Sequence, residues 1–168
     1  FWSRFNPAVS EVIARARGGD IGEVRYLNAD FAFPADVPAD SRLFDPRRGG
    51  GALLDIGVYP LFLAYSVLGV PDRIPARMIP HATGVDLQMG MVLEYPSAIA
   101  MLYSGLASRS NMDATISGTE GRIVIDPTWH ETDSYTLIPN EATSDGRVHR
   151  PKTGRGFYHE IEECHRCI

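Results

Sequence analysis

The sequence contains a pair of side chains whose spacing could support acid-base chemistry, a carboxylate at Asp55 and a phenol at Tyr59. Both lie in an otherwise apolar stretch, Gly49–Pro60, which reads GGGALLDIGVYP. Residues four positions apart on a helix lie one above the other on the same face. An uncompensated buried carboxylate costs roughly several kcal/mol, so such a pair must either be satisfied by partners or be used.

Spacing alone leaves two interpretations of this pair open. In the structural one, Asp55 caps or braces a helix, and Tyr59 is an amphipathic core residue whose hydroxyl finds a partner. In the chemical one, the pair contacts a substrate and one of its groups takes up or releases a proton. A free tyrosine, with a pKa of about 10, is a poor base at neutral pH, but a lysine ammonium beside a phenol favours the phenolate. A tyrosine in this role therefore needs a nearby lysine, with the carboxylate orienting the substrate or that lysine.

The pair requires a helix to position it. The apolar run is entered through Gly49–Gly51 and closed by Gly69, which predicts a buried helix. Pro60 lacks a backbone donor and disfavours α geometry at Tyr59, so we expect a bend there that frees the carbonyl of Ile56. One apolar stripe at helical spacing comprises Leu53, Ile56, Pro60, Leu63 and Val67.

Two periodicities predict the remaining elements. Apolar residues at helical spacing follow Asn6-Pro7 and predict a helix that ends at Arg17, and the segment 158–168 also reads as a helix. The segment 34–48, rich in proline and aspartate, predicts a loop that leads to the glycines. Alternating apolar and polar residues predict strands, hairpins among them, over 23–33, 85–93, 98–106, 111–117, 122–126 and 134–138. The fold class expected is α+β, with a mostly antiparallel open sheet, helices packed on one face, and a second face that is also covered.

Composition is typical of one globular domain over residues 1–168, with 44% hydrophobic and 22% charged residues. A net charge of −5 argues against nucleic acid or an anionic membrane as the main partner. Pro60 and several polar groups interrupt the longest apolar run before it reaches the roughly 20 residues of a membrane span. A basic cluster of Arg147, Arg150, Lys152 and Arg155 reads as solvated loop charge, with a phosphate site as the alternative.

The two cysteines form the sequence Cys164-His165-Arg166-Cys167. Such a pair could be half of a zinc site or a redox pair, but a second ligand pair with metal spacing does not follow, and His159 alone leaves the coordination incomplete. We therefore expect no metal site, and free thiols in a reducing compartment, the cytoplasm.

Three motifs together resemble the C-terminal domain of the Gfo/Idh/MocA-type oxidoreductases. They are the run GGGALLDIGVYP, the opening FWSRFNPA, and the Gly118–Gly121 turn before a β-branched run. The nearest likeness is to the subgroup around dihydrodiol dehydrogenase and glucose-fructose oxidoreductase, because Tyr59 stands where most members have histidine. The fold implied is the glyceraldehyde-3-phosphate dehydrogenase-like C-terminal domain.

The resemblance also implies roles for particular residues. In this family an N-terminal Rossmann domain binds NAD or NADP and supplies a lysine near the nicotinamide. The C-terminal domain supplies the aspartate and the residue four positions later, so Asp55 and Tyr59 become the catalytic and substrate-binding candidates. Trp2 and Arg4 resemble a Trp-x-Arg segment that faces the cofactor cleft. Arg48, beside the glycines, is a further candidate for lining the substrate pocket.

The chain has no Gly-x-Gly-x-x-Gly and no Glu-Lys-Pro motif, so we expect the Rossmann domain to be absent from it and both ends to be truncated. The expected function is the substrate and oligomerisation domain of an oxidoreductase that transfers hydride between NAD or NADP and a sugar, cyclic polyol or dihydrodiol. The cofactor would be bound mainly by the absent domain, this fragment alone would be inactive, and family likeness implies a homo-oligomer through the sheet face. The alternative is a non-catalytic binding or scaffolding domain with the same fold, and a small metal or redox protein is a third possibility.

Overall fold

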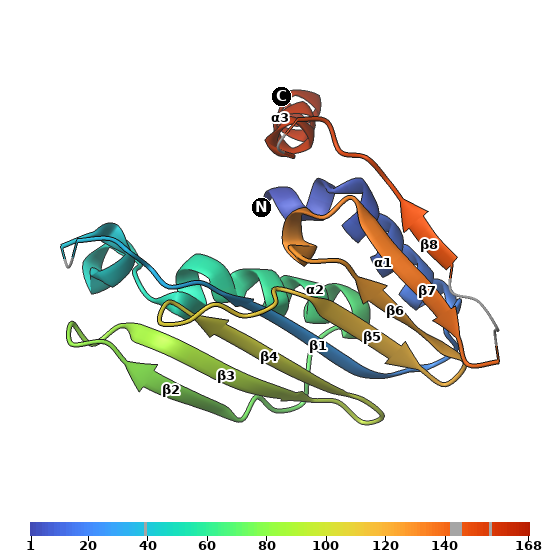
Figure 1. Ribbon diagram of the computed structural model, residues 1–168, viewed down its shortest axis with the longest axis horizontal. Helices are drawn as coiled ribbons and strands as arrows, with labels where there is room; N and C mark the ends of the chain where they lie inside the picture. The colour runs from blue at the N-terminus through green and yellow to red at the C-terminus, as the bar shows by residue number, and fades with distance from the viewer. Residues whose placement is uncertain (39, 142–145, 155) are drawn as a thin grey trace. The chain divides into compact units, whose positions relative to one another are not determined.

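The computed structural model describes residues 1–38, 40–141, 146–154 and 156–168, which divide into two compact units (Figure 1). The terminal unit comprises Phe1–Arg25 and Asp113–Ile168, and the central unit comprises Tyr26–Met112. Each is described by itself. Both combine helices with mostly antiparallel strands, which confirms the predicted α+β class.

The central unit contains four hydrogen-bonded strands in the order β2-β3-β4-β1. Their bounds are Val24–Ala32 for β1, which begins at the end of the terminal unit, Ala76–Pro80 for β2, Asp86–Glu94 for β3 and Ile99–Gly105 for β4. β3 pairs antiparallel with β2 and β4, whereas β1 pairs in parallel with β4, with Leu27 opposite Ala100. The strands predicted at 23–33, 85–93 and 98–106 are confirmed. The short strand β2 and the parallel pairing were not predicted.

The helix that carries Asp55 and Tyr59 has two parts. A π-helical turn spans Leu53–Gly57, and the regular helix α2 spans Val58–Leu68. The predicted bend at Tyr59 is wrong, because the irregular backbone lies in the preceding π turn, and Pro60 stands in the first turn of α2, where a missing N–H is tolerated. The predicted apolar stripe is confirmed, and its buried members are Ile56, Pro60 and Leu63.

An apolar cluster fixes the start of this helix. It comprises Phe44, Ala52, Ile56, Val85 and Leu106. Phe44 comes from the segment 34–48, which contains two short 3-10 turns, Arg42–Phe44 and Pro46–Arg48. The segment predicted as a loop therefore contributes Phe44 to the core cluster. The packing of Phe44 holds the residues next to it in the sequence close to the helix.

The terminal unit contains the antiparallel order β5-β6-β7-β8 and two helices. The bounds are Pro7–Gly18 for α1, Ala114–Gly118 for β5, Gly121–Ile125 for β6, Ser134–Pro139 for β7, Gly146–His149 for β8 and Phe157–Cys167 for α3, with 3-10 turns at Trp2–Phe5 and Trp129–Glu131. Asn6 begins α1, since its Oδ1 accepts a hydrogen bond from the Ala8 N–H at 2.9 Å. α1 packs against β6 and β7. The predicted helices and strands of this unit are confirmed, and β8 is additional.

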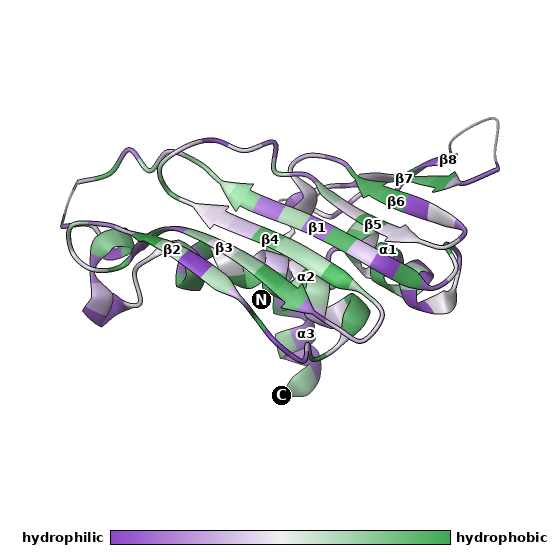
Figure 2. Ribbon diagram, turned by 90° about the horizontal axis from the view of Figure 1, so that it is seen from below, coloured by the Kyte–Doolittle hydropathy of each residue, from purple (hydrophilic) through white to green (hydrophobic). Residues whose placement is uncertain are grey.

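One face of the central strands carries exposed apolar side chains. Ile99 and Met101 of β4 are 49% and 52% exposed, and the Tyr26 hydroxyl lies 3.9 Å from Met101 Sδ. Figure 2 shows β3 and β4 largely in the colours of hydrophobic residues. Ala100 and Leu102 point to the opposite face and are buried there. The cover predicted for the second face does not come from the described part of the chain.

The helical run Pro46–Leu68 is long and apolar enough, by length and composition alone, to cross a membrane. Core helices of soluble proteins meet the same criterion, and Ala52 and Ile56 of this run belong to the core cluster. The run is therefore weak evidence for a membrane span.

Candidate functional site

Asp55 and Tyr59 lie on the same helical segment, one turn apart. Asp55 is inside the π turn and its side chain is 19% exposed. Tyr59 is half-buried, and its ring packs edge-on against that of Phe31 at 5.5 Å between centroids. π-helical turns are rare in proteins and occur often at functional sites. The structure thus holds the phenol by ring packing and places the carboxylate in unusual backbone.

Asp55 has an ion-pair partner that sequence reasoning missed. The Arg42 guanidinium donates through Nη2 to Asp55 Oδ1, and Arg42 itself is 51% exposed. Arg42 begins the short 3-10 turn in the predicted loop. Thirteen positions separate the two residues, a spacing that no helical or strand periodicity relates, so the contact could not be read from a pattern.

The glycines allow this contact. A Cβ on Gly50 would lie 2.7 Å from the carbonyl oxygens of both Arg42 and Leu43, closer than real Cβ atoms approach. The Gly51 N–H donates to the Leu43 carbonyl at 2.8 Å. The turn that carries Arg42 therefore packs directly on the glycine backbone, and a side chain at Gly50 would push the two apart.

A second carboxylate, Asp86, holds the start of the helix. Its Oδ2 accepts from the Leu53 N–H at 2.6 Å, and the side chain is 9% exposed. Gly51, with φ of 109°, passes so close that a Cβ there would overlap the Asp86 carboxylate. A carboxylate at a helix start is favoured by the free N–H groups there. Asp86 lies within the predicted strand 85–93, and its spacing of 33 from Leu53 gave no local signal.

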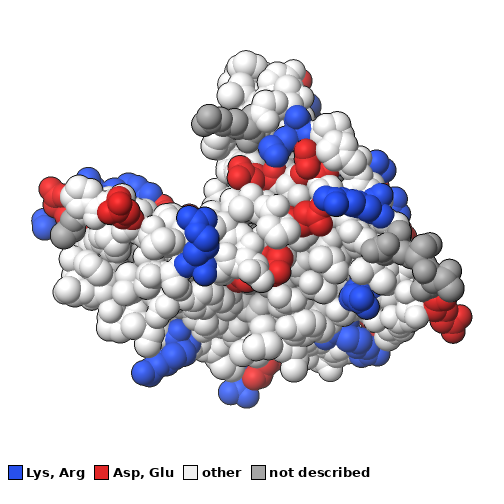
Figure 3. Space-filling model, in the orientation of Figure 1, with Lys and Arg blue, Asp and Glu red and all other residues white. Residues whose placement is uncertain are grey.

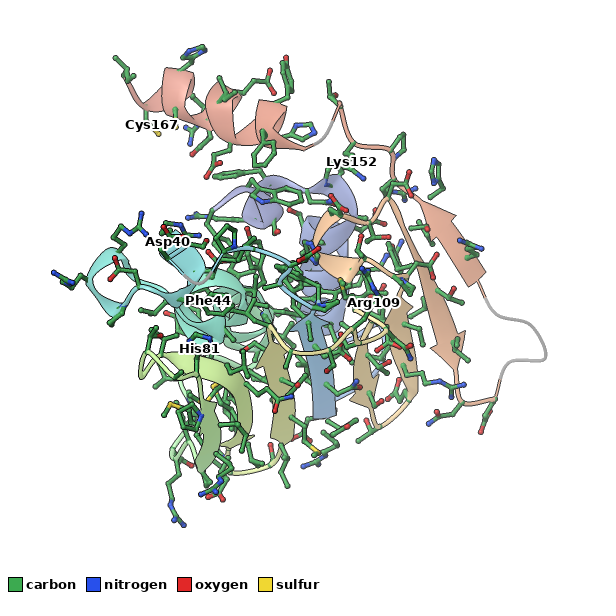
Figure 4. All side chains as sticks on the ribbon, turned by 60° about the vertical axis from the view of Figure 1, so that its left-hand side comes forward. Asp40, Phe44, His81, Arg109, Lys152 and Cys167 are labelled. Carbon is green, nitrogen blue, oxygen red and sulfur yellow. The ribbon has the colours of Figure 1, made fainter. Side chains whose placement is uncertain are left out.

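Aromatic side chains surround this region of the central unit. Phe31 lies 6.1 Å from Phe33 between ring centroids, besides its contact with Tyr59. Phe44 stacks on His81 at 4.2 Å with an interplanar angle of 15°. Both residues are labelled in Figure 4. Phe44 belongs to the core cluster, and Phe31 and Phe33 pack against that cluster.

Arg48 is engaged within its own loop. Its Nε donates to Asp45 at 2.9 Å and its Nη2 donates to the Asp40 carbonyl at 2.7 Å. The pKa of Asp45 lies below its usual value, first because the Arg47 N–H donates to it and then because of Arg48. A substrate contact by Arg48 stays a prediction.

Trp2 and Arg4 belong to the terminal unit. The Trp2 indole is 9% exposed and packs against the rings of His130 at 6.2 Å and Phe157 at 5.2 Å. The Arg4 guanidinium lies over the Phe5 ring at 5.6 Å, beside an open groove of about 720 Å³ along α3. Cofactor contacts by Trp2 and Arg4 stay predictions.

His130 is the most strongly perturbed imidazole in the described residues. It is 7% exposed, and burial lowers its pKa from 6.5 to about 4. The rings of Trp129 and Trp2 pack edge-on against it, at 5.9 Å and 6.2 Å between centroids. His130 is therefore neutral at pH 7 and serves as a core residue.

Three side chains of the basic cluster, those of Arg147, Arg150 and Lys152, have carboxylate or carbonyl partners. Arg147 pairs with Asp126 at 2.6 Å, Arg150 pairs with Glu11, and Lys152 donates to the backbone carbonyl of Glu131. Figure 3 shows the same intermingling of positive and negative side chains on the visible face. These contacts favour solvated and paired loop charge over a phosphate site. Arg155 lies outside the described residues.

Both cysteines, Cys164 and Cys167, are exposed free thiols on α3. Within residues 1–38, 40–141, 146–154 and 156–168, no three His, Cys, Asp or Glu side chains group closely enough to hold a metal ion.

The glycine loop does not form a phosphate cradle. The N–H groups of Gly50 and Gly51 are already bonded to the carbonyls of Asp45 at 3.0 Å and Leu43 at 2.8 Å. A dinucleotide site uses free amides of a glycine-rich turn against the pyrophosphate. The amides of Gly50 and Gly51 are therefore not available to the phosphates of a nicotinamide dinucleotide.

Comparison with known proteins places these features in a family. A sequence model described as the GFO/IDH/MocA C-terminal domain matches residues 9–124. The Trans-1,2-dihydrobenzene-1,2-diol dehydrogenase of Xenopus laevis is 31% identical over 100% of this chain and 52% of its own length. The D-xylose 1-dehydrogenase (NADP(+)) 2 of Haloferax volcanii is 32% identical over 88% of this chain and 46% of its own length.

A solved structure agrees with the sequence comparisons. The aldose-aldose oxidoreductase of Caulobacter crescentus, crystallised with glycerol, superposes with a TM-score of 0.85 at 25% identity, covering 99% of this chain and 52% of that one. The chain thus spans about half the length of the relatives it matches.

Proposed function

The chain belongs to the GFO/IDH/MocA C-terminal domain family, and on that premise we propose that it is the substrate domain of an NAD(P)-dependent oxidoreductase. The observation that carries this proposal is the arrangement around Asp55. A π turn presents the carboxylate, Arg42 pairs with it, and Tyr59 follows one turn later with its ring held by Phe31. The π turn supports this proposal, because such turns occur often at functional sites.

Tyr59 is proposed as the proton-handling group. Oxidising a secondary alcohol releases a hydroxyl proton, and the phenol oxygen would take it, or return it in the reverse direction. A lysine supplied from outside this chain would favour the phenolate during that transfer. Asp55, held by Arg42, would orient a substrate hydroxyl or that lysine.

When bound, the nicotinamide supplies hydride acceptance or donation. Because the glycine amides are already satisfied, the cofactor's phosphates would be held by the rest of the protein. The candidate contacts of this chain are then limited to the nicotinamide side, from Trp2 and Arg4 in the terminal unit. NAD and NADP remain equal candidates for the cofactor.

The substrate proposed is a sugar, cyclic polyol or dihydrodiol. The rings of Phe31 and Tyr59 offer apolar surface to the carbon face of such a ring. The Asp55 carboxylate offers acceptors to vicinal hydroxyl groups. Two relatives are a dihydrodiol dehydrogenase and a xylose dehydrogenase, and the substrates in their names fall in the same chemical class.

We also propose that the protein forms a homo-oligomer through the exposed face of the central strands. Ile99, Met101 and Tyr26 expose apolar surface on adjacent strands, and a second copy would bury it. A cytoplasmic location is proposed with it, since Cys164 and Cys167 are exposed free thiols.

The test is to read the coding sequence that precedes Phe1. We expect roughly 120 in-frame residues containing Gly-x-Gly-x-x-Gly after a predicted strand, and a Glu-Lys-Pro motif. A start codon close to Phe1 would overturn the enzyme proposal for this protein, and the non-catalytic binding domain would replace it.

A further inference from the structure

We propose that Arg42 is the positioning residue of the site, which holds the Asp55 carboxylate in its working orientation. This inference rests on the proposed function, because it concerns how the same site is organised. It starts from the ion pair between Arg42 Nη2 and Asp55 Oδ1.

The loop between the two residues is built so that its ends meet. Asp45 Oδ1 accepts from the Arg47 N–H at 2.9 Å, and the Asp45 carbonyl accepts from the Gly50 N–H at 3.0 Å. The Gly51 carbonyl in turn accepts from the Asp55 N–H at 3.2 Å. Backbone hydrogen bonds thus connect the loop to the π turn independently of the Arg42 side chain.

The Arg42 backbone is held by packing as well as by hydrogen bonds. Phe44, two residues later, is 7% exposed in the core cluster. The Ser41 hydroxyl accepts from the Leu43 N–H at 3.3 Å and begins the 3-10 turn. Gly50 gives the turn room against the helix start. A guanidinium on such a fixed base reaches Asp55 with few rotamers to lose, so it can orient the carboxylate.

Exposure separates a positioning role from a structural one. Arg42 is 51% exposed, and ion pairs at a protein surface contribute little to the stability of the fold. Removing the guanidinium should therefore leave the fold almost unchanged. A side chain misplaced by about 1 Å in an active site, in contrast, can cost on the order of 100-fold in rate.

The first experiment uses the full-length protein. In Arg42→Gln, the three-bond couplings between the α and β protons of Asp55 should change from those of one rotamer to averaged values, while the melting temperature stays within about 2 °C of wild type. Arg47→Gln is the matched control, because Arg47 is exposed in the adjacent turn and carries the same charge. Unchanged couplings in Arg42→Gln would overturn the proposal.

The second experiment measures turnover in the full-length protein. Arg42→Gln should lower kcat by about 10- to 100-fold with a much smaller change in KM, and Arg42→Lys should recover part of the loss. Arg47→Gln should match wild type. A kcat in Arg42→Gln equal to that in Arg47→Gln would overturn the positioning role. So would a large fall in melting temperature that Arg42→Lys does not correct, because it would make the pair a structural brace.

Tyr59→Phe in the same assay separates this inference from the proposed function. If Tyr59→Phe turns over normally, the proposed function fails, whatever the coupling measurement gives for Asp55. If Tyr59→Phe is inactive and Arg42→Gln is normal, only the positioning role of Arg42 fails.

Discussion

Replacing Gly51 by alanine should destabilise the chain far more than the same replacement at Gly49, two residues earlier. Both glycines have positive φ, 109° at Gly51 and 68° at Gly49. Positive φ costs an alanine roughly 1–2 kcal/mol at either position. A Cβ on Gly49 would meet no heavy atom within 4 Å, whereas one on Gly51 would lie 3.2 Å from Asp86 Cγ and overlap its Oδ1.

The additional cost at Gly51 comes from the displaced carboxylate. Asp86 Oδ2 accepts from the Leu53 N–H at 2.6 Å, and hydrogen bonds to charged groups contribute roughly 1.5–3 kcal/mol. Gly51→Ala should therefore lower the free energy of unfolding by about 2.5 to 5 kcal/mol, against about 1 to 2 kcal/mol for Gly49→Ala. For a chain of this size the corresponding losses in melting temperature are on the order of 10 °C and about 5 °C.

Urea unfolding followed by circular dichroism measures both variants under the same conditions. The double variant with Asp86→Ala tests the cause, since it removes the carboxylate that the new Cβ would displace. We expect the two changes to be clearly less than additive, because they disrupt the same contact. Equal destabilisation by Gly49→Ala and Gly51→Ala, or additive effects with Asp86→Ala, would refute this reasoning.

Three further outcomes are expected. Burial holds the pKa of His130 at about 4, below its usual 6.5, so the stability that neutral His130 contributes should be fully present above pH 6.5 and fall by about 3 kcal/mol as the pH drops to about 4. Denaturation measured across this pH range should show a flatter dependence of stability on pH in His130→Phe than in wild type. Equal pH dependences in the two proteins would contradict the assignment. Met101→Lys should convert an oligomer into monomers in light scattering of the full-length protein, and an unchanged mass would exclude the open sheet face as the interface. Cys164 and Cys167 should both react with a thiol reagent in the native chain, and zinc retained after dialysis would revive the metal interpretation.

Periodic patterns predicted most of the fold because they reflect local geometry. The helix after Asn6 has its cap and its apolar spacing within a few residues, and alternation marked the strand later seen as β3. The parallel pairing of Leu27 with Ala100 joins residues more than seventy positions apart, and alternation alone cannot set strand direction. The strand β2 is exposed at every residue, so it lacks the alternation by which strands are recognised.

The residues of the candidate site divide in the same way, into those that a local pattern marks and those that only tertiary contacts bring together. Asp55 and Tyr59 could be found because their spacing is helical. Arg42 and Asp86 could not, since they reach the helix through tertiary contacts. Pro60 gave a misleading signal, because its effect depends on where the regular helix begins, and the π turn moves that start to Val58.

Turnover of Tyr59→Phe in the full-length protein tests the central claim most directly. The variant loses only the hydroxyl, and the phenyl ring can keep its edge-on contact with Phe31. The account predicts a fall in kcat of roughly 100-fold or more, as expected for a lost general acid-base group, with an unchanged circular dichroism spectrum. Turnover close to wild type would contradict the assignment of Tyr59 as the proton-handling residue.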